Sequence, residues 1–246
     1  MNMGKYLSDD ELIATINHSS EPYIIIEGPD DVMIYRWILD DIGFTAYLEP
    51  RNGCGGVRKM YDRRNEITNS KVIYICDKDT IVYTGVIPKG YEDIIYTTGY
   101  SIENDLYQGR KLEKQLFEQK DRELFEKALS SFLRYYACEL EKFQKGQEYN
   151  FREKPEAIIS HKDYSLRVSL LKNFTEPSKK TISYLKSDYD LLLRGHSLFK
   201  LVGMILRRRN RKIQYRDDAL YEICYKLCRS QCVESLQNTI KATLSI

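Results

Sequence analysis

The sequence predicts an α/β fold, with a parallel four-stranded sheet flanked by helices and a mostly helical C-terminal lobe. Residues 23–26 and 72–76 are short, β-branched apolar runs, as expected of strands buried on both faces. Segments with helical periodicity alternate with such runs up to about residue 106, which is typical of a parallel sheet. Beyond Gly109 the chain becomes charged and helical throughout. We therefore predict an α/β domain over residues 20–108 and a helical lobe over 109–246.

The first domain is expected to alternate helices and strands. In chain order we expect a helix over 5–18, a strand over 23–26, a helix from 29 to 42, a strand over 44–48, a helix over 57–67, a strand over 72–76, a loop over 77–90 and a strand over 94–97. Pro29 suits the first position of a helix, and Gly43 suits the position just after its end. In the lobe we expect helices within 110–145 and over 190–209 and 216–243.

Composition excludes several classes of protein. The 246 residues carry a net charge of only +2, so any affinity for nucleic acid must come from local patches. No apolar run is long enough to span a membrane, and the polar, acidic start is not expected to be a signal peptide. Six scattered cysteines suggest reduced thiols in a cytoplasmic protein. The sequence places Cys224, Cys228 and Cys232 on one helix face, where we expect small buried side chains rather than a metal site.

Four acidic residues follow the two buried runs. Glu27 and Asp31 come after the first run, and Asp77 and Asp79 come after the second. Parallel strands deliver functional residues at their carboxyl ends, so these carboxylates should crowd together and bind one or two Mg²⁺ ions, or Mn²⁺. Alternatively, Asp31 is an N-terminal helix acid and the Asp-x-Asp pair forms a turn. Because acidic residues follow both buried runs, the metal site is favoured over these local roles, and the sequence predicts a metal-dependent enzyme.

Glu103 follows the last predicted strand. It could be a further metal ligand, direct or through water, or equally an acid in the first turn of a helix. The sequence leaves both interpretations open.

Two groups of cations stand near residue 200. His196, Lys200, Gly203 and Arg207 share one face of a predicted helix, where Lys200 or His196 could offset transition-state charge; the alternative is a solvated face. The densest basic run is expected to bind phosphates of a nucleic acid, although it could also contact an acidic protein partner. This run consists of Arg207, Arg208, Arg209, Arg211 and Lys212.

Other catalytic schemes lack their motifs. The sequence has no zinc signature around its histidines, no Gly-x-Ser-x-Gly and no phosphate-binding loop of the Gly-x-x-x-x-Gly-Lys-Ser/Thr type. The glycine-rich residues 53–56 could bind phosphate weakly. We expect instead that they let the chain pass close to the acidic cluster.

The carboxylate pattern resembles that of TOPRIM domains, which carry a glutamate after the first strand and Asp-x-Asp after the third. Glu27 would be the glutamate, Asp77 and Asp79 the pair, and Asp31 the extra acid of the overcoming-lysogenisation-defect nuclease branch. Residues 100–106 (Tyr-Ser-Ile-Glu-Asn-Asp-Leu) and 195–200 (Gly-His-Ser-Leu-Phe-Lys) resemble elements of stand-alone TOPRIM proteins of bacterial defence islands. Length and layout are most similar to TOPRIM effectors of the phage anti-restriction-induced defence system, PARIS.

This resemblance implies a Mg²⁺-dependent nuclease. It further implies a toxin that an ABC-type ATPase sensor holds and then releases, after which it cuts host transfer RNA; a homodimer is expected for the free chain. Where the nuclease branch often has lysine after the late glycine, this chain has His196, which leaves open whether His196 or Lys200 supplies the cation. The rival functions are a DNA nuclease of the same family and a non-catalytic subunit that docks an ATPase.

Overall fold

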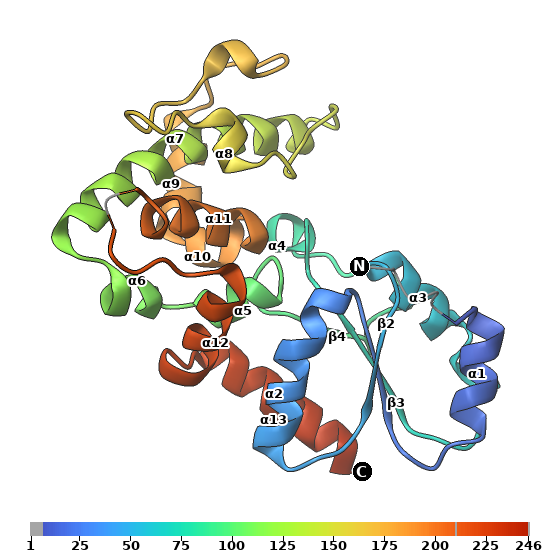
Figure 1. The fold of residues 1–246 in the computed structure, drawn as a ribbon. Coiled ribbons are helices and arrows are strands. Elements are labelled where there is room, and N and C mark those ends of the chain that lie inside the picture. Colours follow the sequence, from blue (N-terminus) through green and yellow to red (C-terminus); the bar gives the residue numbers. More distant parts are fainter. Residues whose placement is uncertain (1–6, 210, 246) are drawn as a thin grey trace. The chain divides into compact units, whose positions relative to one another are not determined.

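The protein forms two compact units in a computed structural model that describes residues 7–209 and 211–245. The first unit contains the described residues up to Thr97 together with those from Gln231 onward, and the second contains Thr98–Ser230. Figure 1 shows the elements of both. The C-terminal helix, predicted as part of the helical lobe, thus belongs to the unit that holds the sheet. Among the described residues, no helix has both the length and the apolar character that crossing a bilayer requires.

The first unit is built on a parallel sheet, which confirms the predicted fold class. Its strands have the order β2-β1-β3-β4, so β1 lies between β2 and β3 and runs parallel to both. The bounds are β1 Tyr23–Ile26, β2 Tyr47–Pro50, β3 Val72–Cys76 and β4 Ile95–Tyr96. Because all strands run in one direction, the residues that follow β1 and β3 emerge at the same edge of the sheet.

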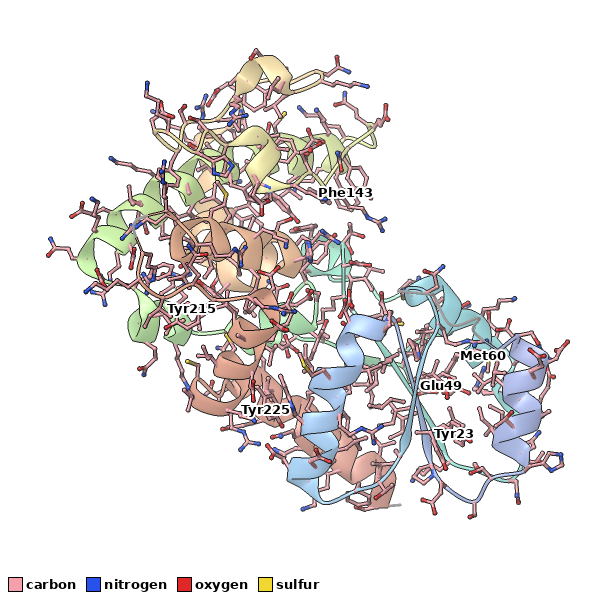
Figure 2. The ribbon with its side chains drawn as sticks, viewed as in Figure 1. Tyr23, Glu49, Met60, Phe143, Tyr215 and Tyr225 are labelled. Carbon is pink, nitrogen blue, oxygen red and sulfur yellow. The ribbon has the colours of Figure 1, made fainter. Side chains whose placement is uncertain are left out.

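Helices cover both faces of this sheet (Figure 1). Helices α1 (Asp9–Asn17) and α3 (Cys54–Asp62) cover one face, while α2 (Val32–Ile42) and α13 (Gln231–Ser245) cover the other. Tyr23 and Met60, labelled in Figure 2, belong to the core under α1 and α3. Both faces of β1 are therefore buried, as its uninterrupted apolar sequence predicts.

Local signals set the ends of these helices. Ser8 forms a capping box with Glu11 at the start of α1, and Gly43 ends α2 in the left-handed conformation, with φ of 71°. The predicted start of a helix at Pro29 is a separate 3₁₀ turn, Pro29–Asp31, which leads into α2. Of the helix predicted over 5–18, residues 5 and 6 lie outside the described residues.

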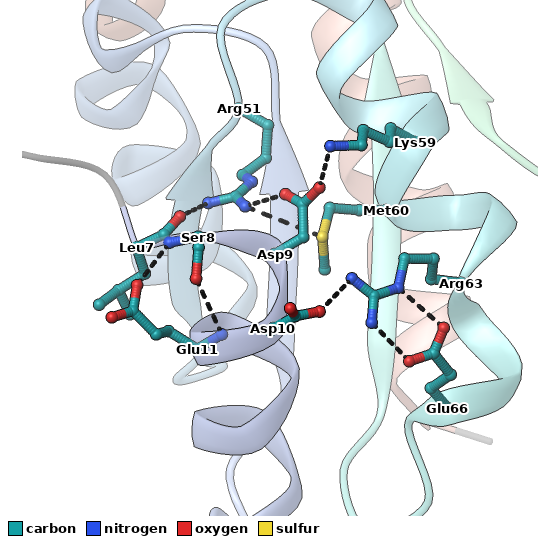
Figure 3. A network of polar contacts seen from close by, with 10 residues as sticks. All are labelled: Leu7, Ser8, Asp9, Asp10, Glu11, Arg51, Lys59, Met60, Arg63 and Glu66. Atoms are coloured by element: carbon teal, nitrogen blue, oxygen red, sulfur yellow. Dashed lines mark hydrogen bonds and ion pairs between the residues drawn. The ribbon is translucent and has the colours of Figure 1, made fainter.

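A polar network ties α1 to α3 and to the segment after β2 (Figure 3). The Arg51 guanidinium, only 8% exposed, donates to the Leu7 carbonyl at 2.9 Å and forms an ion pair with Asp9. Lys59 binds the same carboxylate at 2.6 Å. A hydrogen bond from Lys59, aided by Arg51 and opposed by burial, lowers the pKa of Asp9. This network fixes the chain where the glycine-rich loop begins.

The second unit is helical and has its own aromatic core. Its long helix, α7 (Gln119–Gln144), contacts α9 and α11. The other helices are α5 Ile102–Tyr107, α6 Lys111–Leu116, α8 Pro155–Ile158, α9 Lys179–Ser187, α10 Tyr189–Leu192, α11 Gly195–Leu206 and α12 Asp217–Leu227. Phe132 and Tyr136 of α7 are fully buried and contact each other. Phe143, also of α7 and labelled in Figure 2, packs against Tyr149.

Several predicted boundaries were wrong. The strand predicted over 44–48 is Tyr47–Pro50, and the helix predicted over 57–67 starts at Cys54 and ends at Asp62. The loop predicted over 77–90 contains a short helix, α4 (Ile81–Thr84). The long helix predicted over 190–209 is broken because Leu193 is extended between α10 and α11. These errors concern ends and breaks, where tertiary contacts override periodicity.

The three late cysteines do not share one helix. Cys228 follows the last residue of α12, so the helix predicted over 216–243 is broken there, and Cys232 lies in α13. All three side chains are buried, as predicted.

Candidate functional site

Glu27 and Asp77 lie together at the carboxyl edge of the sheet. Glu27 follows β1 and Asp77 follows β3, the neighbouring parallel strand. The Asp77 backbone N–H donates to Glu27 Oε1 at 2.8 Å. Strand order and direction thus produce the convergence that the sequence pattern predicted.

The Glu27 carboxyl is held in an environment that disfavours its charge. Burial raises its pKa to about 7, and the negative charge of Asp79 contributes in the same direction. Hydrogen bonds from the N–H groups of Asp77 and Cys54, and the charge of Arg58, oppose the shift without cancelling it. A cation bound near this carboxyl would relieve both the burial penalty and the repulsion from Asp79.

Asp79 stands in a tight turn just after β3. Its φ of 47° is in the left-handed region, which aspartate tolerates better than most residues. The N–H of Ile81 donates to the Lys78 carbonyl at 2.8 Å, and the Lys78 N–H donates to the Thr97 hydroxyl at 3.0 Å. The turn that brings Asp79 towards Glu27 is therefore held at both sides.

Asp31 has a local structural role. Its Oδ2 accepts a hydrogen bond of 2.9 Å from the Gly28 N–H, which closes the 3₁₀ turn after Glu27. A side chain on Gly28 would crowd this arrangement, since a Cβ there would lie 3.1 Å from Asp31 Oδ2. Asp31 therefore has the local role that the alternative interpretation gave it, since its side chain stabilises the turn in which it stands. The same bond holds its carboxyl at the backbone of Gly28, the residue that follows Glu27.

The glycine-rich loop approaches the acidic edge as expected. The Gly53 N–H donates to the Glu27 carbonyl at 2.9 Å, and α3 begins at the next residue. Gly53 has a φ of 92°, which requires glycine. Gly56 is equally constrained, because a Cβ there would overlap the Arg51 carbonyl oxygen at 1.7 Å.

Two cysteines complete the surroundings of Glu27, and sequence reasoning missed them. One ligand atom each from Glu27, Cys54 and Cys76 lies within 4.8 Å of the other two. Over 7–209 and 211–245 this is the single His/Cys/Asp/Glu group that meets so tight a limit, so no three of the four predicted carboxylates do. The hydrogen bond between the Cys54 and Cys76 thiols lowers the pKa of Cys54 against the opposing effect of burial, and the same bond raises the pKa of Cys76. The available signal was position: Cys76 directly precedes Asp77.

In the second unit, residues 100–106 pack against residues 190–195. The Asn104 amide donates to the carbonyls of Asp190 and Leu193, each at 2.8 Å, and its oxygen accepts from the Ser101 N–H at 3.0 Å. Gly195 packs so closely that a Cβ would lie 2.4 Å from the Ser101 hydroxyl. Asn104 is fully buried, so it joins the segments structurally.

Glu103 and His196 are neighbours within this junction. Glu103 lies in the first turn of α5 and accepts a hydrogen bond from the Ser101 hydroxyl at 2.5 Å. Burial lowers the pKa of His196, as does the charge of Arg194, while Glu103 acts in the opposite direction. Both side chains are half-buried.

Lys200 and Arg207 bind an acid of their own unit. Lys200 Nζ lies 2.5 Å from Asp217 Oδ2, and Arg207 Nη1 lies 2.7 Å from Asp217 Oδ1. Burial acts to raise the pKa of Asp217, but the two cations outweigh it and lower this pKa. The Arg207 guanidinium also covers Gly203, where a Cβ would meet Nη2 at 1.9 Å. The absence of a side chain at Gly203 therefore makes room for the Arg207 guanidinium.

The basic run divides into inward and outward side chains. Arg208 and Arg211 form ion pairs with Asp121, whose side chain is fully buried. Arg211 also donates to the Leu116 carbonyl at 2.8 Å. Arg209 and Lys212 are exposed. Three of the five predicted phosphate-binding residues are thus engaged with acids of the same unit.

Two cavities, one in each unit, do not coincide with these residues. A cavity of about 300 Å³ in the first unit is lined by Val72 at the start of β3 and by Tyr61 of α3. Another, of about 480 Å³, is lined by Tyr135, Glu139 and neighbouring residues of the second unit. Neither is lined by a predicted site residue, so the acidic edge of the sheet lies outside both cavities.

Comparison with protein-family models finds no family that matches this chain, and a search of curated proteins finds no significant match.

Proposed function

We propose that the protein is a Mg²⁺-dependent endonuclease whose metal-binding residues are Glu27, Asp31, Asp77 and Asp79. One observation carries this proposal: a partly buried glutamate with a pKa near 7 stands at the carboxyl edge of a parallel sheet, repelled by Asp79. An arrangement of carboxylates that is unfavourable by itself is typical of sites that bind a divalent cation. The donor set fits a hard cation, because carboxylate oxygens are the ligands that Mg²⁺ prefers.

The chain's own residues account for how such a site would be held. The N–H groups of Asp77 and Cys54 orient the Glu27 carboxylate, and the left-handed turn presents Asp79. A bound divalent ion would activate water and neutralise charge on a phosphodiester. When deprotonated, Glu27 would offer an oxygen to such an ion or accept a proton from the attacking water. The supporting roles of Glu103, His196 and Lys200 are proposed from the sequence.

We propose RNA, specifically host transfer RNA, as the substrate, and a cytoplasmic toxin of an anti-phage system as the biological role. The support is the resemblance of residues 20–106 and, to a lesser degree, 190–206 to TOPRIM effectors of defence systems. The same resemblance supports an ABC-type ATPase as the partner that restrains the toxin, and a homodimer for the free chain.

The test is cleavage of total cellular RNA by the purified protein with Mg²⁺, beside Glu27→Gln. We expect discrete transfer-RNA fragments from the wild type, and loss of a general base to lower the rate by about 10²–10⁴-fold. Glu49→Gln is a matched control, because Glu49 lies in β2 and belongs to no predicted site. Equal cleavage by Glu27→Gln would contradict the proposed site. Cleavage of duplex DNA alone would indicate a DNA nuclease, and no cleavage of either would favour a docking subunit.

A further inference from the structure

Two free thiols meet beside Glu27. Cys54 is the first residue of α3 and Cys76 is the last residue of β3. Their sulfurs lie 3.0 Å apart, although the residues are 22 positions apart in the sequence. This separation is shorter than the roughly 3.5–4.0 Å of ordinary non-bonded carbon contacts. A shift of about 1 Å would bring the sulfurs to the roughly 2.05 Å of a disulfide bond.

The position of the pair links it to the carboxyl. The Cys54 N–H donates to Glu27, and the other donor is the N–H of Asp77, the residue after Cys76. The Cys54 thiol therefore belongs to one of the two residues whose N–H groups hold Glu27. The Cys76 thiol belongs to the residue before the other, Asp77. A bond between the sulfurs would fix the spacing of those groups.

The two thiols differ in accessibility. Cys54 is partly exposed, whereas Cys76 is only 1% exposed. An oxidant from solution therefore reaches Cys54 first, and Cys76 is in place to react with the oxidised sulfur. The remaining cysteines, Cys138, Cys224, Cys228 and Cys232, are all buried.

We propose that Cys54 and Cys76 are a redox modification site, which closes to an intramolecular disulfide under peroxide and lowers the activity of the carboxylate site. In the first step, Cys54 sulfur attacks a peroxide oxygen, the O–O bond breaks, and a sulfenic acid and one water form. In the second, Cys76 sulfur attacks Cys54 sulfur and expels the sulfenic oxygen as a second water. The thiols lose two electrons and the peroxide gains them.

Loss of activity follows from the geometry. Closing the bond draws the sulfurs about 1 Å closer, which shifts the backbone of Cys54 and Cys76, so the two N–H donors no longer hold the Glu27 carboxyl in the position that the site requires. Displacing a catalytic group by about 1 Å can cost about 10²-fold, and we expect at least a tenfold loss. This half of the inference rests on the proposed nuclease function, whereas the disulfide itself does not.

The experiment treats the full-length protein with hydrogen peroxide, maps its peptides without reduction, and measures RNA cleavage before and after dithiothreitol. We expect one cross-linked peptide pair containing Cys54 and Cys76, lighter by two hydrogens, and cleavage that dithiothreitol restores. Cys54→Ser should form no cross-link, and peroxide should leave its cleavage rate at the value that the same variant shows before treatment, while Cys138→Ser should behave like the wild type.

Three other results are informative. Sulfinic acid on Cys54 with Cys76 still free would overturn the proposal, and so would a cross-link that leaves cleavage unchanged. A mapped cross-link in a protein that cleaves RNA in neither state would uphold the modification site and refute the nuclease instead.

Discussion

Glu27 and Asp217 are both partly buried acids, yet their surroundings shift their pKa values in opposite directions. Burial and the Asp79 charge raise the pKa of Glu27, whereas Lys200 and Arg207 lower that of Asp217 despite its burial. The first unit therefore keeps an unfavourable concentration of negative charge at the edge of its sheet. In the second unit, by contrast, Asp121 and Asp217 are each paired with two bases of the same unit.

This contrast separates function from stability. Carboxylates whose role is to stabilise the fold are expected to be paired with cations when they are buried. Asp121 and Asp217 are paired in this way, with Arg208 and Arg207. A pKa shifted by burial and by a neighbouring like charge, as at Glu27, is typical of binding and catalytic sites. By the same reasoning, much of the basic run near residue 210 stabilises the helical unit, and charge counted along the sequence overstates what is available to a phosphate.

The largest expected effect is on stability, from removal of Asp121. Asp121→Ala leaves Arg208 and Arg211 largely buried without their acid, and breaking a buried pair costs about 3–5 kcal/mol. Denaturant unfolding followed by circular dichroism measures the loss. Asp218→Ala is the control, because its ion pair with Arg216 is exposed, and it should cost less than about 1 kcal/mol. Equal effects would show that the arginines are not held as described.

Whereas Asp121→Ala should destabilise the protein, Glu27→Gln should stabilise it at pH 8. The folded-state pKa of Glu27, about 7, exceeds the ordinary 4.5, so folding binds a proton in that window and the wild type loses stability as pH rises through it. The variant escapes this loss, a gain of about 1–3 kcal/mol above pH 7 that vanishes near pH 4. Thermal unfolding from pH 4 to pH 8 tests the sign; a difference independent of pH would contradict the raised pKa.

A smaller effect is expected on RNA binding, and only from the exposed cations of the basic run. Replacing Arg209 and Lys212 together by alanine should weaken RNA binding about 3–10-fold and reduce the salt slope by about 1–2. Stability should change by less than about 0.5 kcal/mol, because both side chains are exposed. Filter binding at several salt concentrations measures both quantities. Lys179→Ala with Lys180→Ala removes the same charge elsewhere, and an equal loss there would show that the effect is nonspecific.

Much of the first unit could be predicted from sequence. Residues 23–26 and 72–76 are recognisable because buried parallel strands are apolar on both faces, and the acids that follow them must emerge at one edge. The end of α2 was equally clear, since Gly43 favours the left-handed conformation. Each of these signals is local.

What could not be predicted depends on partners distant in the chain. Asp121 pairs with Arg211 across 90 positions, and Cys54 meets Cys76 across 22. Helical periodicity placed Lys200, Gly203 and Arg207 on one face but gave no sign that Asp217 would bind two of them. Such contacts arise from the packing of elements, which a periodic pattern does not specify.

The central claim is that the acidic edge of the sheet binds a divalent cation through Glu27. The most direct measurement is titration with Mn²⁺, with free ion followed by electron paramagnetic resonance, at pH 7.5 for the wild type, Glu27→Gln and Asp217→Asn. We predict saturable binding by the wild type and Asp217→Asn, and affinity at least about tenfold weaker for Glu27→Gln, the weakening expected from losing about 1.4 kcal/mol of ligand interaction. Equal affinity in all three proteins, or no binding by the wild type, would contradict the account.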